Sequence, residues 1–188
     1  MRILLPAVSL ALTGCLAGEP LRYVVEPAAV ASSERVRVTA RTVSIVEVSL
    51  PEYAKDTKLF VEADENALQA LRRADWGEEP ERAFANTLVR ELTQITGAQV
   101  ATDPWPLGGV PDAEVRVRVS HMVVGNDGTV SLAGHFSVRR DEAVERNRVE
   151  LFSLRTPSGV AESASPADVV RAHAAAWREL AAVISRTL

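Results

Sequence analysis

Cysteine is nearly absent from this chain of 188 residues, in which Cys15 is the only one. A single cysteine cannot form an internal disulfide, so a disulfide-bonded scaffold is excluded. The apolar stretch near the start, from Ile3 to Leu12, falls well short of the roughly 20 residues that a membrane-spanning helix needs. A short apolar stretch behind one positive charge, Arg2, is instead typical of a secretory signal peptide.

Sequence motifs of common enzyme classes are also missing. There is no G-x-S-x-G nucleophile turn and no G-x-x-x-x-G-K-[ST] phosphate loop, and the pair Gly108-Gly109 is more typical of a turn than of a phosphate site. The formal net charge is −4, and Lys and Arg do not cluster along the sequence, which argues against nucleic acid as a partner. We therefore expect neither an enzyme nor a nucleic-acid-binding protein.

The three histidines leave one catalytic alternative open. His121 and His135 fall on the two strands of a predicted hairpin and could approach one another, as in a zinc site, but no third ligand is spaced near them. His173 lies one turn before Trp177 in a predicted helix, where a packed histidine is the ordinary interpretation. We expect no metal, and an anchored hydrolase that uses His121 and His135 is the less favoured hypothesis.

The four residues Leu12-Thr13-Gly14-Cys15 resemble a bacterial lipobox. Such a motif has a branched apolar residue at −3, small residues beside the cleaved bond, and a thiol at +1 that receives the lipid. Cleavage between Gly14 and Cys15 would leave Cys15 with a diacylglycerol on its thiol and a further acyl chain, such as palmitate, on its amine. We expect no other cofactor. The alternative is a secreted protein with an incidental cysteine at its cleavage site.

We expect three parts in the chain: a signal peptide over 1–14, a lipidated tether over 15–20, and one domain over 21–188. At no more than about 3.6 Å per residue, the tether reaches roughly 22 Å and keeps the domain close to its membrane. Residue 16 is Leu rather than the Asp that is associated with retention in the inner membrane. This favours the outer membrane, with the domain facing the periplasm.

Hydrophobic periodicity predicts an α/β domain with two helices. One is expected over about 78–96 and ends at Gly97, and the other runs from Ser165-Pro166 almost to Leu188. Strands are expected at 21–26, once or twice within 34–50, and at 57–63, 98–102, 113–139 (a hairpin) and 146–155, whereas 66–76 is ambiguous. This order predicts a single domain with a mixed β-sheet flanked by helices, a long antiparallel hairpin and a C-terminal helix.

Aromatic and proline residues gather in predicted loops and at the ends of predicted elements. Tyr and Trp at irregular positions often serve binding, because they bring a large contact area at low entropic cost. The candidate contacts with a protein partner are therefore Leu50, Pro51, Tyr53, Trp76 and Trp105. The alternative is that these side chains cover one end of the core.

The same segments carry a family resemblance. VSLPEYAKDTKLFV (48–61), ADWGEEPERAFANTLVREL (74–92), the DPWP loop and the alternating AEVRVRVSHMVV resemble the ABC-type transport auxiliary lipoproteins in order and spacing. The resemblance implies an anticodon-binding-domain-like α/β fold and a non-enzymatic role. It also implies two kinds of partner: an ABC or integral-membrane transporter, and a periplasmic MCE-domain protein that conducts lipids between the membranes. A homo-oligomer of this chain is a further partner state that the resemblance implies.

Three functional hypotheses follow. The favoured one is a lipoprotein subunit of an intermembrane lipid transport system, which docks or stabilises the transport complex at the outer membrane. The second is an outer-membrane biogenesis lipoprotein that supports lipopolysaccharide or barrel assembly. The anchored hydrolase is the third.

Overall fold

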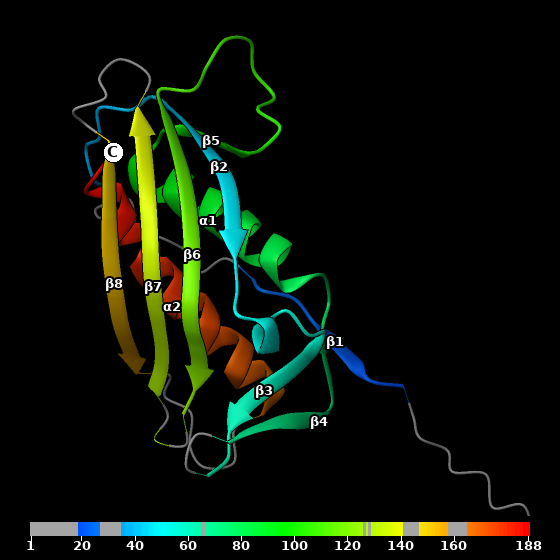
Figure 1. The fold of residues 1–188 in the computed structure, drawn as a ribbon. Helices are drawn as coiled ribbons and strands as arrows, with labels where there is room; N and C mark the ends of the chain where they lie inside the picture. The colour runs from blue at the N-terminus through cyan, green and yellow to red at the C-terminus, as the bar shows by residue number, and fades with distance from the viewer. Residues whose placement is uncertain are drawn as a thin grey trace, which may run out of the picture.

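The computed structural model describes residues 19–26, 35–64, 67–125, 127, 129–140, 147–157 and 165–188. In these residues the chain alternates strands with two long helices (Figure 1), so the predicted α/β class is confirmed. The elements in chain order are β1 (Leu21–Tyr23), β2 (Thr42–Ser49), the 3-10 helix η2 (Glu52–Ala54), β3 (Lys58–Glu62), β4 (Leu68–Trp76), α1 (Pro80–Thr96), β5 (Gln99–Thr102), β6 (Ala113–Val124), β7 (Thr129–Arg140), β8 (Arg148–Pro157) and α2 (Pro166–Ser185).

The larger of two sheets has the strand order β5-β2-β6-β7-β8. β2 runs parallel to both β5 and β6, and β6, β7 and β8 follow one another antiparallel. Alternation in β6 places Val115, Val117 and Val119 on the buried face and Arg116 and Arg118 on the exposed face. The predicted hairpin and the strand that follows it are therefore confirmed.

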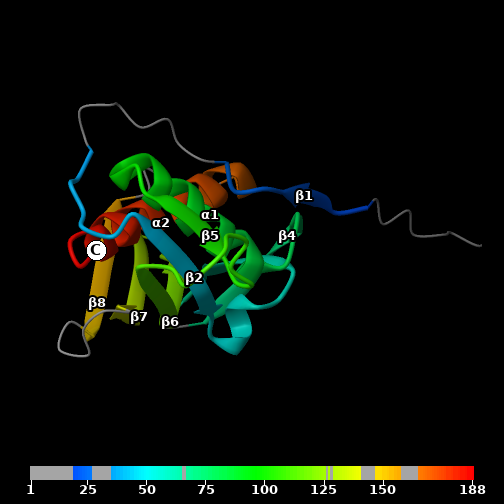
Figure 2. The same cartoon turned by 90° about the horizontal axis from the view of Figure 1, so that it is seen from above.

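Both helices cover the same face of the larger sheet, as the view from above shows (Figure 2). Pro80 occupies the first turn of α1, and Gly97 ends the helix in the left-handed conformation at φ 73°. Ser165 caps α2 through a capping box with Asp168. The apolar faces of α1 and α2 meet between the helices and the sheet, and the core contains Phe84, Trp177, Leu180 and Ile184.

The smaller sheet has the order β1-β4-β3, so the strands are divided between two sheets where the sequence predicted one. β4 covers the segment that periodicity left ambiguous, and it pairs antiparallel with β3 and parallel with β1. Leu21 pairs with Ala74, across a separation of more than fifty positions. Local periodicity does not report such long-range pairing, because it reflects only which face of a strand is buried.

The alternating run RVRVTA does not form a strand, although it was predicted to lie within one or two. Its backbone bonds to helix ends instead. The Val36 amide donates to the carbonyl of Ile95, and the amides of Thr39 and Ala40 donate to the carbonyl oxygen of Leu188. The valines in this run are half-buried against the core, which accounts for the alternation without a sheet partner.

Candidate functional site

Two of the candidate contact residues, Tyr53 and Trp76, line one small pocket where the two sheets meet. η2 supplies Tyr53, the last position of β4 supplies Trp76, and α2 adds His173. The other lining residues are Ala54, Lys58, Phe60, Leu68, Met122 and Val123. The volume of about 20 Å³ has room for about one water molecule. This place is therefore a packed junction rather than a cleft for a substrate.

Hydrogen bonds attach the turn after β2 to two other elements. The amide of Leu50 donates to Oε1 of Glu81 in the first turn of α1 at 3.0 Å. The amide of Met122 at the end of β6 donates to the hydroxyl oxygen of Tyr53 at 3.0 Å. Nζ of Lys55 lies 3.6 Å from the Glu81 carboxylate. Glu81 therefore links the turn to the helix, a role that the sequence did not indicate, since Glu81 also suits a helix start.

Trp76 belongs to an aromatic cluster that joins the smaller sheet to both helices. Its ring packs edge-on against Phe84 with ring centroids 5.5 Å apart, and its ring centroid lies 5.7 Å from that of His173. Phe84 stacks on Trp177 with ring centroids 4.6 Å apart. His173 is fully buried, and this burial lowers its pKa from 6.5 to about 4, so the ring is neutral near pH 7. The packed histidine that the sequence predicted is confirmed.

The five candidate contacts differ in how much surface they offer. Leu50 and Trp76 are only 4% and 6% exposed and lie in the core. Pro51 and Tyr53 are half-buried beside them. Trp105 is also half-buried but lies in the loop between β5 and β6. Figure 1 places this loop at the opposite end of the larger sheet from β3 and β4. A contact role for the five residues stays a prediction, and Pro51, Tyr53 and Trp105 offer more surface for it than Leu50 and Trp76.

The first described residues are attached to the strand that carries Trp76. β1 pairs with β4 in the register Leu21 with Ala74 and Tyr23 with Trp76. The Gly77 amide donates to the carbonyl of Tyr23 at 2.6 Å. Leu21 is 63% exposed, so an apolar side chain faces solvent at this end of the domain. Whatever precedes residue 19 is thus connected to the junction through β1.

The histidines of the hairpin do not face one another directly. His121 pairs with Ala133, and His135 pairs with Arg118. Among the described residues, no group of three or more His, Cys, Asp or Glu side chains is arranged to hold a metal ion. The hydrolase hypothesis therefore gains no third ligand from the part of the chain that the structure describes.

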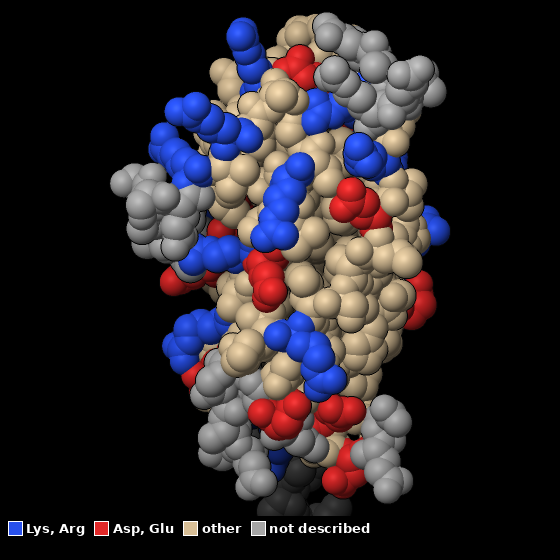
Figure 3. Space-filling view, turned by 90° about the vertical axis from the view of Figure 1, so that its left-hand side faces the viewer, with Lys and Arg blue, Asp and Glu red and all other residues tan. Residues whose placement is uncertain are grey.

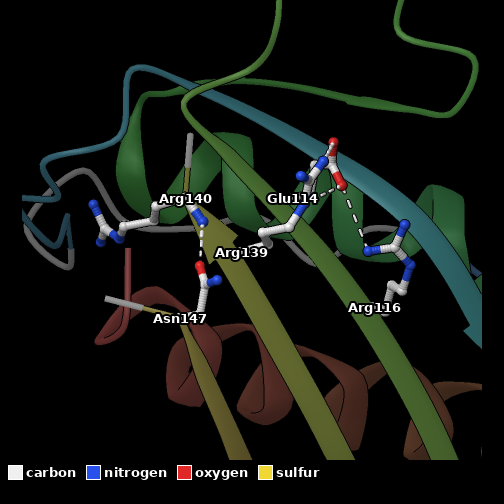
Figure 4. Close-up of polar contacts among 5 residues, drawn as sticks. All are labelled: Glu114, Arg116, Arg139, Arg140 and Asn147. Carbon is white, nitrogen blue, oxygen red and sulfur yellow. Dashed lines mark hydrogen bonds and ion pairs between the residues drawn. The ribbon is translucent and has the colours of Figure 1, made fainter. Parts of the chain in front are cut away.

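An ion-pair cluster lies on the exposed face of the larger sheet (Figure 4). The Glu114 carboxylate accepts from Arg139 on β7 at 2.5 Å and lies 3.5 Å from Arg116. The hydrogen bond from Arg139 is the main cause of a lowered pKa at Glu114. Asn147 accepts from the backbone amide of Arg140 nearby. Sequence alternation placed these side chains outward but did not reveal their pairing.

The lipidation and cleavage residues predicted above, Cys15 and Gly14, lie outside the described residues. Within the described part of the chain, neither helix combines the length and the apolar character that crossing a membrane requires.

Comparison with known proteins gives a family and a fold. Residues 23–185 match the family described as ABC-type transport auxiliary lipoprotein component. No curated protein matches the chain. An uncharacterized protein of known crystal structure is similar at a TM-score of 0.69 and 16% identity, covering 90% of this chain and 98% of its own. A Xanthomonas campestris protein assigned to DUF330 is similar at a TM-score of 0.59 and 16% identity, with coverage of 90% and 93%. At these identities the two structures support the fold alone.

Proposed function

The chain belongs to the family of ABC-type transport auxiliary lipoprotein components, and on that premise we propose a specific role within an envelope transport system. The protein is a lipid-anchored, periplasm-facing subunit of an ABC/MCE-type intermembrane lipid transport system. It docks or stabilises the transport complex at the outer membrane. Its partners are an MCE-domain protein and components of an ABC or integral-membrane transporter, and the domain acts by position rather than by catalysis. The match over residues 23–185 carries this proposal.

The lipobox-like sequence supports the proposed anchor. Residues 1–14 would be removed as a signal peptide, and Cys15 would carry the lipids. Only residues 16–18 separate Cys15 from the first described residue, Glu19. From there the chain soon enters β1, which pairs with β4. A domain attached in this way has little freedom to move away from its membrane, as a docking subunit requires.

The surface near β1 supports a protein contact at the anchored end. Leu21 and Val24 are 63% and 59% exposed, although both are apolar. Pro51 and Tyr53 lie half-buried in the turn at the junction. Apolar and aromatic side chains at a surface are the groups that dominate binding energy in protein interfaces. The proposed contact with a transport component therefore centres on these four residues, and Trp105 belongs to a separate surface.

Co-purification tests the proposal directly. The native lipidated protein is solubilised gently from membranes, captured, and its partners are identified by mass spectrometry, with Cys15→Ser as the matched control. We expect an MCE-domain protein or a transporter component with the wild type, and loss or weakening of that recovery with Cys15→Ser. Recovery of lipopolysaccharide or barrel assembly factors alone would instead support the biogenesis hypothesis and contradict the transport role.

A further inference from the structure

A basic pocket lies where the end of β7, the start of β8 and the end of α2 come together. Its volume is about 570 Å³, which is within the range of small-molecule sites. Four of its lining residues are arginines, and none of the described lining residues has an acidic side chain. They are Arg37, Arg140, Arg148 and Arg186, with Val36, Val38, Thr39, Ser185, Thr187 and Leu188 completing the wall. Arg37 stands more than a hundred positions from Arg148, so the cluster exists only in the folded chain.

One of the four arginines is structural. Nη1 of Arg140 donates to the hydroxyl of Thr39 at 2.8 Å, and its Nη2 donates to the carbonyls of Thr187 and Leu188 at 2.7 and 2.6 Å. Figure 4 shows the guanidinium of Arg140 turned away from the Glu114 cluster. Arg140 therefore joins β7 to the end of α2 and fixes the floor of the pocket.

The other three guanidinium groups differ from that of Arg140. The side chains of Arg37, Arg148 and Arg186 are exposed and form no hydrogen bond or ion pair with any described residue. Elsewhere in the described chain, five arginine side chains form ion pairs with carboxylates: Arg116, Arg139, Arg155, Arg171 and Arg178. Three positive charges that pair with no carboxylate of the described residues surround one concavity, in a chain whose formal net charge is −4. They create a local potential that favours an anion.

The shape of guanidinium indicates which anion fits. A planar guanidinium presents its N–H groups as a fork that matches phosphate and carboxylate oxygens in pairs. A carboxylate has only two oxygens to share, whereas a phosphate group has three or four and accepts from several arginines at once. We propose that the pocket formed by Arg37, Arg148 and Arg186 binds a phosphate group. Val36, Val38 and Leu188 add apolar wall beside it, which suits a phosphate carried by an apolar molecule.

The pocket lies far from the end of the domain where the chain enters. Figures 1 and 2 both place the C-terminal end of α2 on the opposite side of the molecule from β1. Figure 3, which views the β8 side, shows Lys and Arg predominating over its upper part, the part nearest this end of α2. The inference goes beyond the proposed function and does not rest on it, because binding at this pocket requires neither the anchor nor a transport partner.

Titration calorimetry on the full chain in a neutral detergent tests the proposal and its ligand source. The probes are inorganic phosphate, dihexanoyl-phosphatidylglycerol, and dihexanoylglycerol as the phosphate-free analogue. The pocket variant is R37Q/R148Q/R186Q, and R22Q/R72Q/R118Q is the matched control, since it removes the same charge from exposed arginines outside the pocket. We expect phosphate-bearing probes to bind the wild type and the control within about twofold of each other, and the pocket variant to bind at least tenfold more weakly.

Each outcome has a defined meaning. Tighter binding of the phosphatidylglycerol supports a lipid headgroup, whereas binding of inorganic phosphate alone supports a free phosphate. Absence of binding, equal loss in both triple variants, or equal binding of dihexanoylglycerol would overturn the proposal. If the triple variant does not fold, the single variant R186Q takes its place, and its thermal melting curve shows whether it is folded. We expect R186Q to bind the phosphate-bearing probes severalfold more weakly than the wild type.

Discussion

His173 is the residue whose burial has the clearest consequence in solution. Its pKa is lowered from 6.5 to about 4 by desolvation, so the unfolded chain binds more protons than the native protein between these values. The free energy of unfolding is therefore retained above about pH 6.5 and falls as the pH drops toward 4. We expect residues 19–188 to lose roughly 2 kcal/mol between pH 7 and pH 5 in urea unfolding.

The variant His173→Leu separates this effect from other titrations. It removes the proton-binding group, so most of the loss between pH 7 and pH 5 should disappear, whatever the variant does to stability at pH 7. The carboxyl groups of Asp112, Glu114 and Asp168, whose pKa values are lowered, lose their stabilising contribution mainly below this range. An unchanged pH dependence in the variant would contradict the assignment to His173.

Glu91 shows what sequence reasoning at the residue scale does not reach. It lies seven positions after Phe84 on the apolar face of α1 and is 1% exposed. Its carboxylate meets Nε of Arg178 on α2 at 3.0 Å. Periodicity identifies a charged residue at a core position, but its partner lies 87 positions away and depends on how the two helices pack. The packed position of His173, by contrast, followed from its spacing to Trp177.

Replacing Arg178 alone should destabilise the protein more than replacing both members of the ion pair between Glu91 and Arg178. Arg178→Met leaves the buried Glu91 carboxylate without this ion pair, and we expect a loss of about 2 to 4 kcal/mol, below the usual upper value because Arg178 is 30% exposed. Glu91→Leu combined with Arg178→Met replaces both charges by apolar groups and should be more stable than Arg178→Met alone. Urea unfolding of the three proteins measures this, and a double variant that is less stable than the single one would refute it.

Among the elements, the β6–β7 hairpin depends on one close approach of two strands. Gly134 pairs with Val119 next to a bulge, and a Cβ on Gly134 would lie 2.2 Å from the carbonyl oxygen of Arg118. Gly134→Ala should therefore force the strands apart and cost about 2 kcal/mol or more. Ser137→Ala on the same strand is the control, with little expected change. Equal urea midpoints for the two variants would show that the strands accommodate a side chain at Gly134.

The apolar pattern of the sequence indicates that bulge. Val115, Val117 and Val119 alternate on odd positions, and the apolar residues then shift to Met122 and Val124, which are even. Such a change of phase means that one residue has been added to the strand, and the structure places the irregularity between Val119 and His121. Period-two alternation thus predicted the strand well.

In two other segments, the alternation of apolar and polar residues did not predict the strands correctly. The alternation reflects which side chains are buried and not how the backbone is hydrogen-bonded. The run RVRVTA alternates as a strand does, yet it bonds to the carbonyl oxygens of Ile95 and Leu188 at helix ends. The segment that became β4 alternates poorly, because exposed residues follow one another at Arg72 and Arg73. Arg73 has a positive φ of 56°, which interrupts the regular strand geometry. These two segments account for most of the difference between the predicted and observed strands.

For the whole molecule, the sequence predicted the class of the fold and its two helices but not how the strands divide. The smaller sheet depends on the pairing of β1 with β4, which are far apart in the sequence. It also depends on the aromatic cluster of Trp76, Phe84 and Trp177, whose members come from three separate elements. The basic pocket is likewise assembled from distant segments. Both features form only in the complete fold. No short segment of the sequence, read by itself, could therefore predict either of them.

The proposed lipid anchor on one side of the domain leads to a prediction about the tether. If position near the membrane is how the protein acts, lengthening the chain between Gly18 and Glu19 should weaken recovery of the transport partner without affecting the domain. Twelve Gly and Ser residues inserted there add a root-mean-square length of roughly 20 Å, comparable with the reach of the original tether. Lipidation at Cys15, membrane association and the melting temperature should be unchanged, since the insertion precedes β1 and its pairing with β4.

A two-residue insertion at the same point is the control for the tether prediction. It changes the local sequence in the same way but adds less than about 8 Å even when fully extended. Partner recovery from membranes should therefore stay close to wild type with two residues and fall severalfold with twelve. Full recovery with the twelve-residue insertion would mean that contacts of the domain suffice for docking. The short distance from Cys15 to β1 would then have no part in the function.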